Sequence, residues 1–196
     1  MYELPTTVIV CDKEYAIRNK ADYRVILDVI AACQDVDISP SEQAVSALSI
    51  FYECIEDEDE VFTAFDDIQE ASKVMMSFIG CNDNEYVGYK VNRKLIDWIQ
   101  DEQLIVSAIN NVAKTEIRAL PYMHWWTLIS HYMAIGECSL STIVGIRDKI
   151  SRGKKLEKYE QEFKRNNPQY FTWKTQKTQE EKQFEDNIAE LWKDSK

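Results

Sequence analysis

The fold class is decided by residues 22–32, DYRVILDVIAA, and by residues 39–55, SPSEQAVSALSIFYECI, which follow after a short acidic connection. In the first stretch the apolar side chains recur every three or four positions, as on one face of a helix, at Tyr23, Ile26, Leu27 and Ile30. Asp22 stands just before them, where an N-cap residue is expected. This spacing predicts a mainly α-helical protein.

The second stretch carries a complete helix-start signal. Ser39 occupies the cap position, Pro40 the first helical position, and Glu42 lies three residues after the cap, as in a capping box. Working outward, the same spacing predicts a further helix from Val61 to Ile79, one from Asp101, one opened by Pro121, one capped by Ser139 or Ser141, and a basic amphipathic stretch over Lys154–Arg165. We expect six to eight helices in all.

Only the N-terminus shows the two-residue period of a β-strand. Val8 and Val10 point to one side, and Tyr15 and Ile17 repeat the two-residue period after the polar turn Cys11-Asp12-Lys13-Glu14. These two runs predict a short hairpin near residues 7–18.

The chain is expected to form a single helical domain over residues 1–167, hairpin included. Residues 168–196 begin with a polar linker rich in Thr, Gln and Lys. Within them, residues 178–193 are expected to form a helix that is either a detachable tail or docks on a partner. Its apolar side chains are Phe184, Ile188, Leu191 and Trp192.

The composition excludes several classes of function. The net charge is −11, which argues against a nucleic-acid partner, because such binding depends on neutralising phosphates. No apolar run approaches the ~20 residues of a membrane span, so no membrane partner is expected. The five cysteines form no Cys-x-x-Cys pair, and the N-terminus lacks the pattern of a signal peptide. We therefore expect a reduced cytoplasmic protein.

Charge is distributed unevenly along the chain. Residues 1–100 contain 8 basic and 20 acidic residues, whereas residues 101–196 contain 15 basic and 14 acidic ones. The acidic run Glu56–Glu60 is favoured as a solvated helix start, and a calcium loop is the alternative, although the run lacks the glycine that such a loop requires.

The sequence contains no recognisable catalytic or metal-binding motif. The two histidines, His124 and His131, are seven residues apart and thus ~10 Å apart along a helix axis, too far to share a metal. No Gly-rich phosphate loop, zinc-protease motif or serine-hydrolase elbow occurs. We expect neither enzymatic activity nor a cofactor.

Two segments are the best candidates for partner binding. One surrounds the adjacent tryptophans; since neighbouring positions on a helix diverge by about 100°, one ring is expected in the core and the other against a second helix or a partner. The other is the basic stretch from Arg147 to Arg165, for which a solvated helix face is the alternative. The candidate residues are His124, Trp125, Trp126, Arg147, Lys154, Lys155, Leu156 and Phe163.

The same segments carry a resemblance to a known family. They read Tyr122-Met-His-Trp-Trp-Thr, Ile135-Gly-Glu, Ile146-Arg-Asp-Lys, Gly153-Lys-Lys-Leu-Glu-Lys and Glu160-Gln-Glu-Phe, and Leu4-Pro5-Thr-Thr-Val fits near the N-terminus. In this order they resemble the bacteriophage Gp-fifteen family of Gram-positive siphophage tail proteins, over residues 4–167. Members of that family are typically encoded just ahead of the tape-measure protein, where tail assembly chaperones are encoded.

The resemblance implies a tail assembly chaperone that binds the phage tape-measure protein in the host bacterial cytoplasm and is absent from the mature virion. A second tail assembly chaperone is a further partner that it implies. A competing hypothesis from another class is a phage-encoded acidic inhibitor of a host or defence protein, whose surface imitates nucleic acid.

Overall fold

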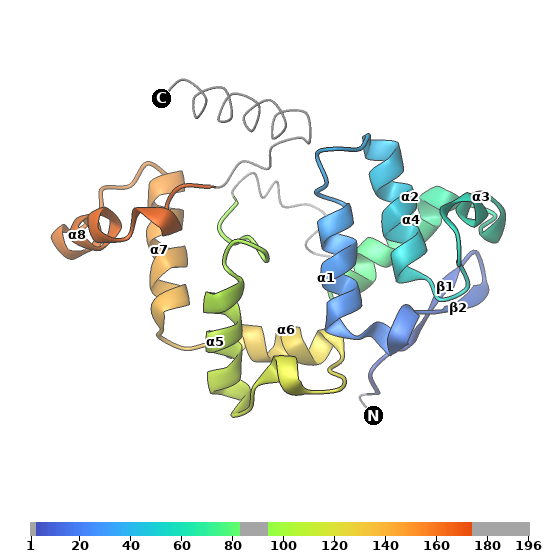
Figure 1. Cartoon of the computed structure of the whole chain (residues 1–196), viewed down its shortest axis with the longest axis horizontal. Coiled ribbons are helices and arrows are strands. Elements are labelled where there is room, and N and C mark those ends of the chain that lie inside the picture. Colours follow the sequence, from blue (N-terminus) through green and yellow to red (C-terminus); the bar gives the residue numbers. More distant parts are fainter. Residues whose placement is uncertain (1–2, 83–93, 174–196) are drawn as a thin grey trace, which may run out of the picture.

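The computed structural model describes residues 3–82 and 94–173, and within them it contains eight α-helices and one two-stranded sheet (Figure 1). The strands are β1 (Thr7–Val10) and β2 (Lys13–Ala16). The helices are α1 (Tyr23–Ala32), α2 (Pro40–Phe51), α3 (Val61–Ala64), α4 (Ile68–Ile79), α5 (Glu102–Ala113), α6 (Trp125–Met133), α7 (Ser139–Ser151) and α8 (Lys158–Asn166). The mainly α-helical fold with an N-terminal hairpin is confirmed. The expected tail helix at 178–193 lies outside the described residues.

The hairpin is tighter than its sequence suggested. Strands β1 and β2 pair antiparallel, with Val10 opposite Lys13, so only Cys11 and Asp12 form the turn. Both turn residues have positive φ angles, 48° and 62°, which matches the right-handed twist of the two strands. Lys13 and Glu14 therefore belong to β2 and not to the turn.

The first two helices begin where their caps predicted. The Asp22 carboxylate accepts a hydrogen bond from the backbone N–H of Arg24 at the start of α1. Ser39 and Glu42 form the reciprocal capping box at the start of α2. Each cap satisfies N–H groups that the first turn of a helix leaves without partners.

The single helix expected from Val61 to Ile79 is wrong, because the structure divides it into α3 and α4. Phe65 is extended (φ −119°, ψ 137°), and the Asp67 carboxylate accepts hydrogen bonds from the N–H groups of Gln69 and Glu70. Asp67 thus caps a new helix in the middle of the apolar periodicity. The apolar side chains stay in step across the break, which is why spacing alone did not reveal it.

Three later helices also begin at residues other than those expected. Helix α6 begins at Trp125, four residues after Pro121, because His124 is its N-cap. Helix α7 is capped at Cys138, and Ser141 accepts a hydrogen bond from the Cys138 N–H. Helix α8 begins only at Lys158, after a non-helical connection from α7.

Gly153 ends α7 with a positive φ of 65°. The N–H of Lys154 donates to the carbonyl of Lys149, and that of Gly153 donates to the carbonyl of Ile150. This is the Schellman arrangement, in which glycine is favoured because it adopts the left-handed conformation without a Cβ penalty.

The helices form two groups joined through α6. Figure 1 shows the hairpin and α1 to α4 on one side of the molecule, α5 and α7 on the other, and α6 between them. Helix α6 packs against both α1 and α5. None of the helices in the described residues has both the length and the apolar character needed to cross a bilayer.

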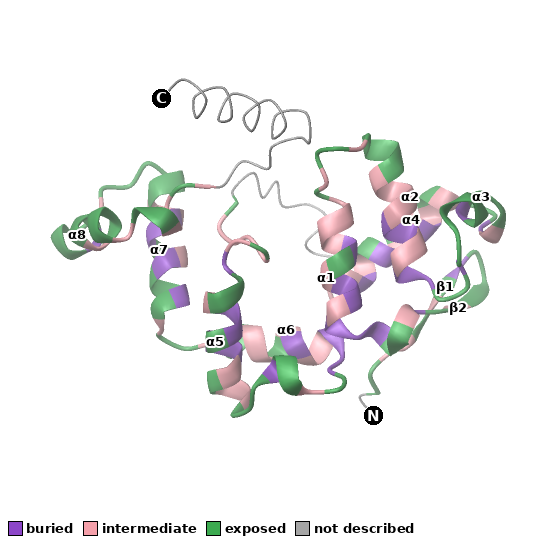
Figure 2. Ribbon diagram, viewed as in Figure 1, coloured by how far each residue is buried: buried purple, intermediate pink, exposed green. Residues whose placement is uncertain are grey.

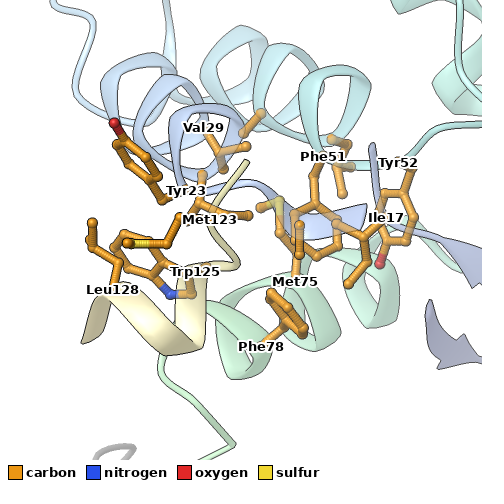
Figure 3. Packing of buried hydrophobic residues seen from close by; sticks show 14 of the residues in the cluster. Ile17, Tyr23, Val29, Phe51, Tyr52, Met75, Phe78, Met123, Trp125 and Leu128 are labelled. Carbon is orange, nitrogen blue, oxygen red and sulfur yellow. The ribbon is translucent and has the colours of Figure 1, made fainter. Parts of the chain in front are cut away.

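Buried residues lie along the inward faces of these helices (Figure 2). In the core, Trp125 and Leu128 of α6 lie near Tyr23 of α1, and Phe51 of α2 packs edge-on against Phe78 of α4 (Figure 3). The core therefore depends on contacts between residues more than 100 positions apart in sequence.

Candidate partner-binding surface

His124 is a buried cap within the core. Its Nδ1 accepts a hydrogen bond from the backbone N–H of Trp126 at 3.0 Å, so the ring proton resides on Nε2. That Nε2–H donates to the carbonyl oxygen of Pro5 at 2.9 Å. Burial lowers the pKa of His124, although the hydrogen bond to Pro5 opposes this. The histidine therefore stays neutral and ties the N-terminus to the start of α6.

The two tryptophans cap the end of α4. The indole N–H of Trp125 donates to the carbonyl of Ile79 at 2.9 Å, and that of Trp126 donates to the carbonyl of Phe78 at 3.0 Å. These are two of the final carbonyls of α4, which have no partner within their own helix. Trp125 is buried, whereas Trp126 is half-buried and stacks on the Phe78 ring at a centroid distance of 5.3 Å. Of the two contacts expected for the second tryptophan ring, another helix or a partner, Trp126 makes the first, with α4.

The segment preceding α6 is also joined to the start of α1. The N–H of Tyr23 donates to the carbonyl of Met123, and the N–H of Met123 donates to the Asp22 carboxylate at 3.0 Å. Together with His124 and the tryptophans, these bonds connect α1, α4, α6 and the N-terminus. His124, Trp125 and Trp126, which we call the His-Trp-Trp joint, therefore hold these elements together inside the protein. They leave little surface accessible to a partner.

Arg147 lies inside the protein, on α7. All five of its N–H donors are used, in a bidentate ion pair with Asp101 (2.6 and 2.9 Å) and in hydrogen bonds to the carbonyls of Leu95 and Tyr170. The Asp101 side chain is fully buried, and the guanidinium also lies over the ring of Trp173. Arg147 thus fastens residues 95–101 and 168–173 to α7, and it offers no free surface to a partner.

Lys154 and Lys155, in contrast, are exposed on the connection between α7 and α8. In the stretch from Arg147 to Arg165, all four carboxylates are paired with a cation: Asp148 with Arg152, Glu157 and Glu160 with Lys149, and Glu162 with Arg165. Among the described residues, no carboxylate pairs with the remaining cations, Lys154, Lys155, Lys158 and Lys164. The excess positive charge of this stretch is therefore available at the surface.

A groove opens beside these lysines. It has a volume of about 540 Å³ and is lined by apolar Leu156, Pro168 and Phe171 and by polar Gln161, Lys164, Arg165 and Thr172. The rings of Phe163 and Phe171 pack edge-on, with their centroids 6.3 Å apart. Phe163 is half-buried, as is Leu156. Leu156 thus lines the groove, and Phe163 packs against Phe171 of its lining; neither His124 nor the tryptophans line it.

The acidic run is exposed at all five positions from Glu56 to Glu60. Asp57 caps a short 3₁₀ turn, Glu58–Glu60, and Glu60 accepts a hydrogen bond from the backbone N–H of Glu56. No group of His, Cys, Asp and Glu side chains in residues 3–82 and 94–173 could hold a metal ion. The run is used as a solvated helix start.

Comparison with protein families decides what kind of protein this is. A family model described as Bacteriophage Gp15 protein matches residues 1–171. The chain belongs to this bacteriophage family. No curated protein and no solved structure matches it. The Gp15 match spans the His-Trp-Trp joint, the Arg147 cluster and the groove as far as Phe171, so all three lie within the family's own fold.

The sequence did not reveal two parts of this region. Asp101 was expected only at a helix start, and nothing local marks it as the partner of Arg147, 46 residues away. Pro168 and Phe171 were assigned to the polar extension, yet they line the groove. The aromatic residues at 170, 171 and 173, directly after a helix stop, were a signal that this segment packs against the domain.

Proposed function

We propose that this chain is a tail assembly chaperone that binds the phage tape-measure protein in the host cytoplasm and is not retained in the virion. Membership of the Gp15 family over residues 1–171 is the observation that carries the proposal. A second tail assembly chaperone is a further partner within the same proposal. Neither nucleic acid, membrane, cofactor nor enzymatic activity has a part in it.

The surface on the connection to α8 supports this function. A chaperone must release its client, so its contacts should be modest and partly polar. Lys154, Lys155 and Lys158 provide positive charge without a carboxylate partner in the described part of the chain, next to half-buried Leu156. Such a surface suits an amphipathic helix with acidic side chains, which docks through its apolar face and is oriented by charge. We place the client contact here.

Co-expression with the tape-measure protein of the same phage tests the proposal. The tape-measure protein alone should aggregate, and this chain should keep it soluble and purify with it. The variant Lys154→Glu/Lys155→Glu should lose this effect. Lys73→Glu/Lys114→Glu changes the net charge equally on other elements and should retain it, because both lysines lie at exposed sites on α4 and after α5.

Deletion of the gene from the phage provides the second test. The mutant should accumulate capsids without tails. Normal tails in the deletion mutant would contradict the chaperone function. They would instead favour the acidic inhibitor, for which the exposed run Glu56–Glu60 is the supporting observation. Under that alternative, neutralising the run should abolish the phage's effect on its host while leaving tails intact.

A further inference from the structure

One end of the molecule presents an exposed aromatic ring beside acidic side chains that form no ion pair within the described part of the chain. Phe62 of α3 is 63% exposed, and it directly follows the run Glu56–Glu60. No Lys or Arg of the described residues forms an ion pair with any of these five carboxylates. Phe62 and the carboxylates beside it together match a partner site that combines apolar side chains with positive charge.

The groove beside α8 has that chemistry. Its lining combines apolar Leu156, Pro168 and Phe171 with two cations, Lys164 and Arg165. Lys164 has no carboxylate partner among the described residues, and Arg165 reaches Glu162 only at 3.9 Å, with both side chains exposed. At about 540 Å³ the groove is larger than a phenylalanine side chain.

These two features cannot meet within one chain. Figure 1 places α3 at one end of the long axis of the molecule and α8 at the opposite end. Phe62 and the acidic run of one copy can therefore reach only the groove of another copy. A contact between two different surfaces of identical chains is heterologous, and it extends into a row or closes into a ring.

We propose that copies of this chain associate head to tail, with Phe62 of one copy seated in the α8 groove of the next. The carboxylates of Glu58, Asp59 and Glu60 then face Lys164 and Arg165. The contact is small, so the association is weak and depends on concentration. Since the charges are exposed, added salt weakens it by screening. The proposal does not depend on the identity of the client.

Sedimentation velocity on the full chain tests this contact. The wild-type chain should shift to larger species as its concentration rises, and less so when salt increases from about 0.05 M to about 0.5 M. Phe62→Ser and Lys164→Glu/Arg165→Glu should each weaken association by more than about tenfold, as expected for truncation of an anchor or reversal of its charges. Met133→Ser, at an apolar site 73% exposed on α6, should leave association unchanged.

Mixing the two defective variants gives the decisive result. Phe62→Ser retains an intact groove, and Lys164→Glu/Arg165→Glu retains an intact Phe62. The mixture should therefore form one-to-one dimers that cannot grow, which no contact between identical surfaces would produce. Circular dichroism and melting temperature confirm that each variant is folded. A wild-type chain that stays monomeric at about 1 mM, or a mixture that stays monomeric, would overturn the proposal.

Discussion

Replacing Arg147 by methionine should strongly destabilise the domain. Methionine keeps much of the side-chain volume but removes the charge and all five donors. The Asp101 carboxylate, whose side chain is 0% exposed, would then retain, among residues 3–82 and 94–173, only the N–H of Asp97 at 3.1 Å as a hydrogen-bond donor. Removing one member of a buried ion pair costs about 3–5 kcal/mol, because the other charge is left buried without compensation.

Urea unfolding followed by circular dichroism measures this loss. With a slope of about 2 kcal/mol per M, a loss of 3–5 kcal/mol lowers the midpoint by roughly 1.5–2.5 M. Asp101→Leu should have a similar effect. The double variant should be less destabilised than the sum of the two by about 2–3 kcal/mol, since both singles destroy the same pair. Additive losses, or an Arg147→Met midpoint within about 0.3 M of the wild type, would refute the reasoning.

The remaining predictions concern the joint and the helix ends. Trp125→Ala should cost about 3–5 kcal/mol of stability, as for other buried large aromatics. Trp126→Phe should cost only about 1 kcal/mol, because an aromatic ring remains and one hydrogen bond is lost. Thermal unfolding compares the two variants, and equal losses would contradict the assignment. Because burial lowers the pKa of His124, the unfolded chain binds a proton that the folded chain does not, so stability should fall as pH drops through about 6.5. A pH series of urea midpoints measures this fall. His124→Asn, which retains a capping acceptor, should flatten it. Gly145→Ala, at an exposed site inside α7 where a Cβ meets no atom within 4 Å, should stabilise the protein by about 0.5–1 kcal/mol. Gly153→Ala should cost about 1–2 kcal/mol, because the φ angle of Gly153 is 65°. The two variants should shift the melting temperature in opposite directions.

Much of the local structure was predictable because its causes are local. Ser39 and Glu42 cap α2 by touching groups within three residues, and Asp22 caps α1 in the same way. Gly80 and the residues after it end α4 for an equally local reason, a left-handed turn at Cys81. The break between α3 and α4 was not predicted, because the apolar periodicity continues through it. Its one local signal is Asp67, which caps α4.

The candidate site was predictable only in part. The basic stretch could be found from composition, and Lys154 and Lys155 are exposed as a charged stretch suggests. Arg147 belongs to the same stretch by sequence and yet is buried, because Asp101 and Tyr170 offer it acceptors from elements far along the chain. Charge patterning does not distinguish a solvated arginine from one in a buried pair, since the difference lies entirely in the partner.

By itself, the sequence determined the helical class, the hairpin, the caps of α1 and α2 and the contrast between an acidic N-terminal half and a more basic C-terminal half. All of these follow from residue type and short-range spacing. The tertiary structure alone decided that the indoles of Trp125 and Trp126 cap α4 and that His124 reaches Pro5. It also decided that α3, which contains Phe62, and α8 lie at opposite ends of the molecule (Figure 1). The physical reason is that these relations join groups distant along the chain, and their energy exists only once packing has brought the helices together.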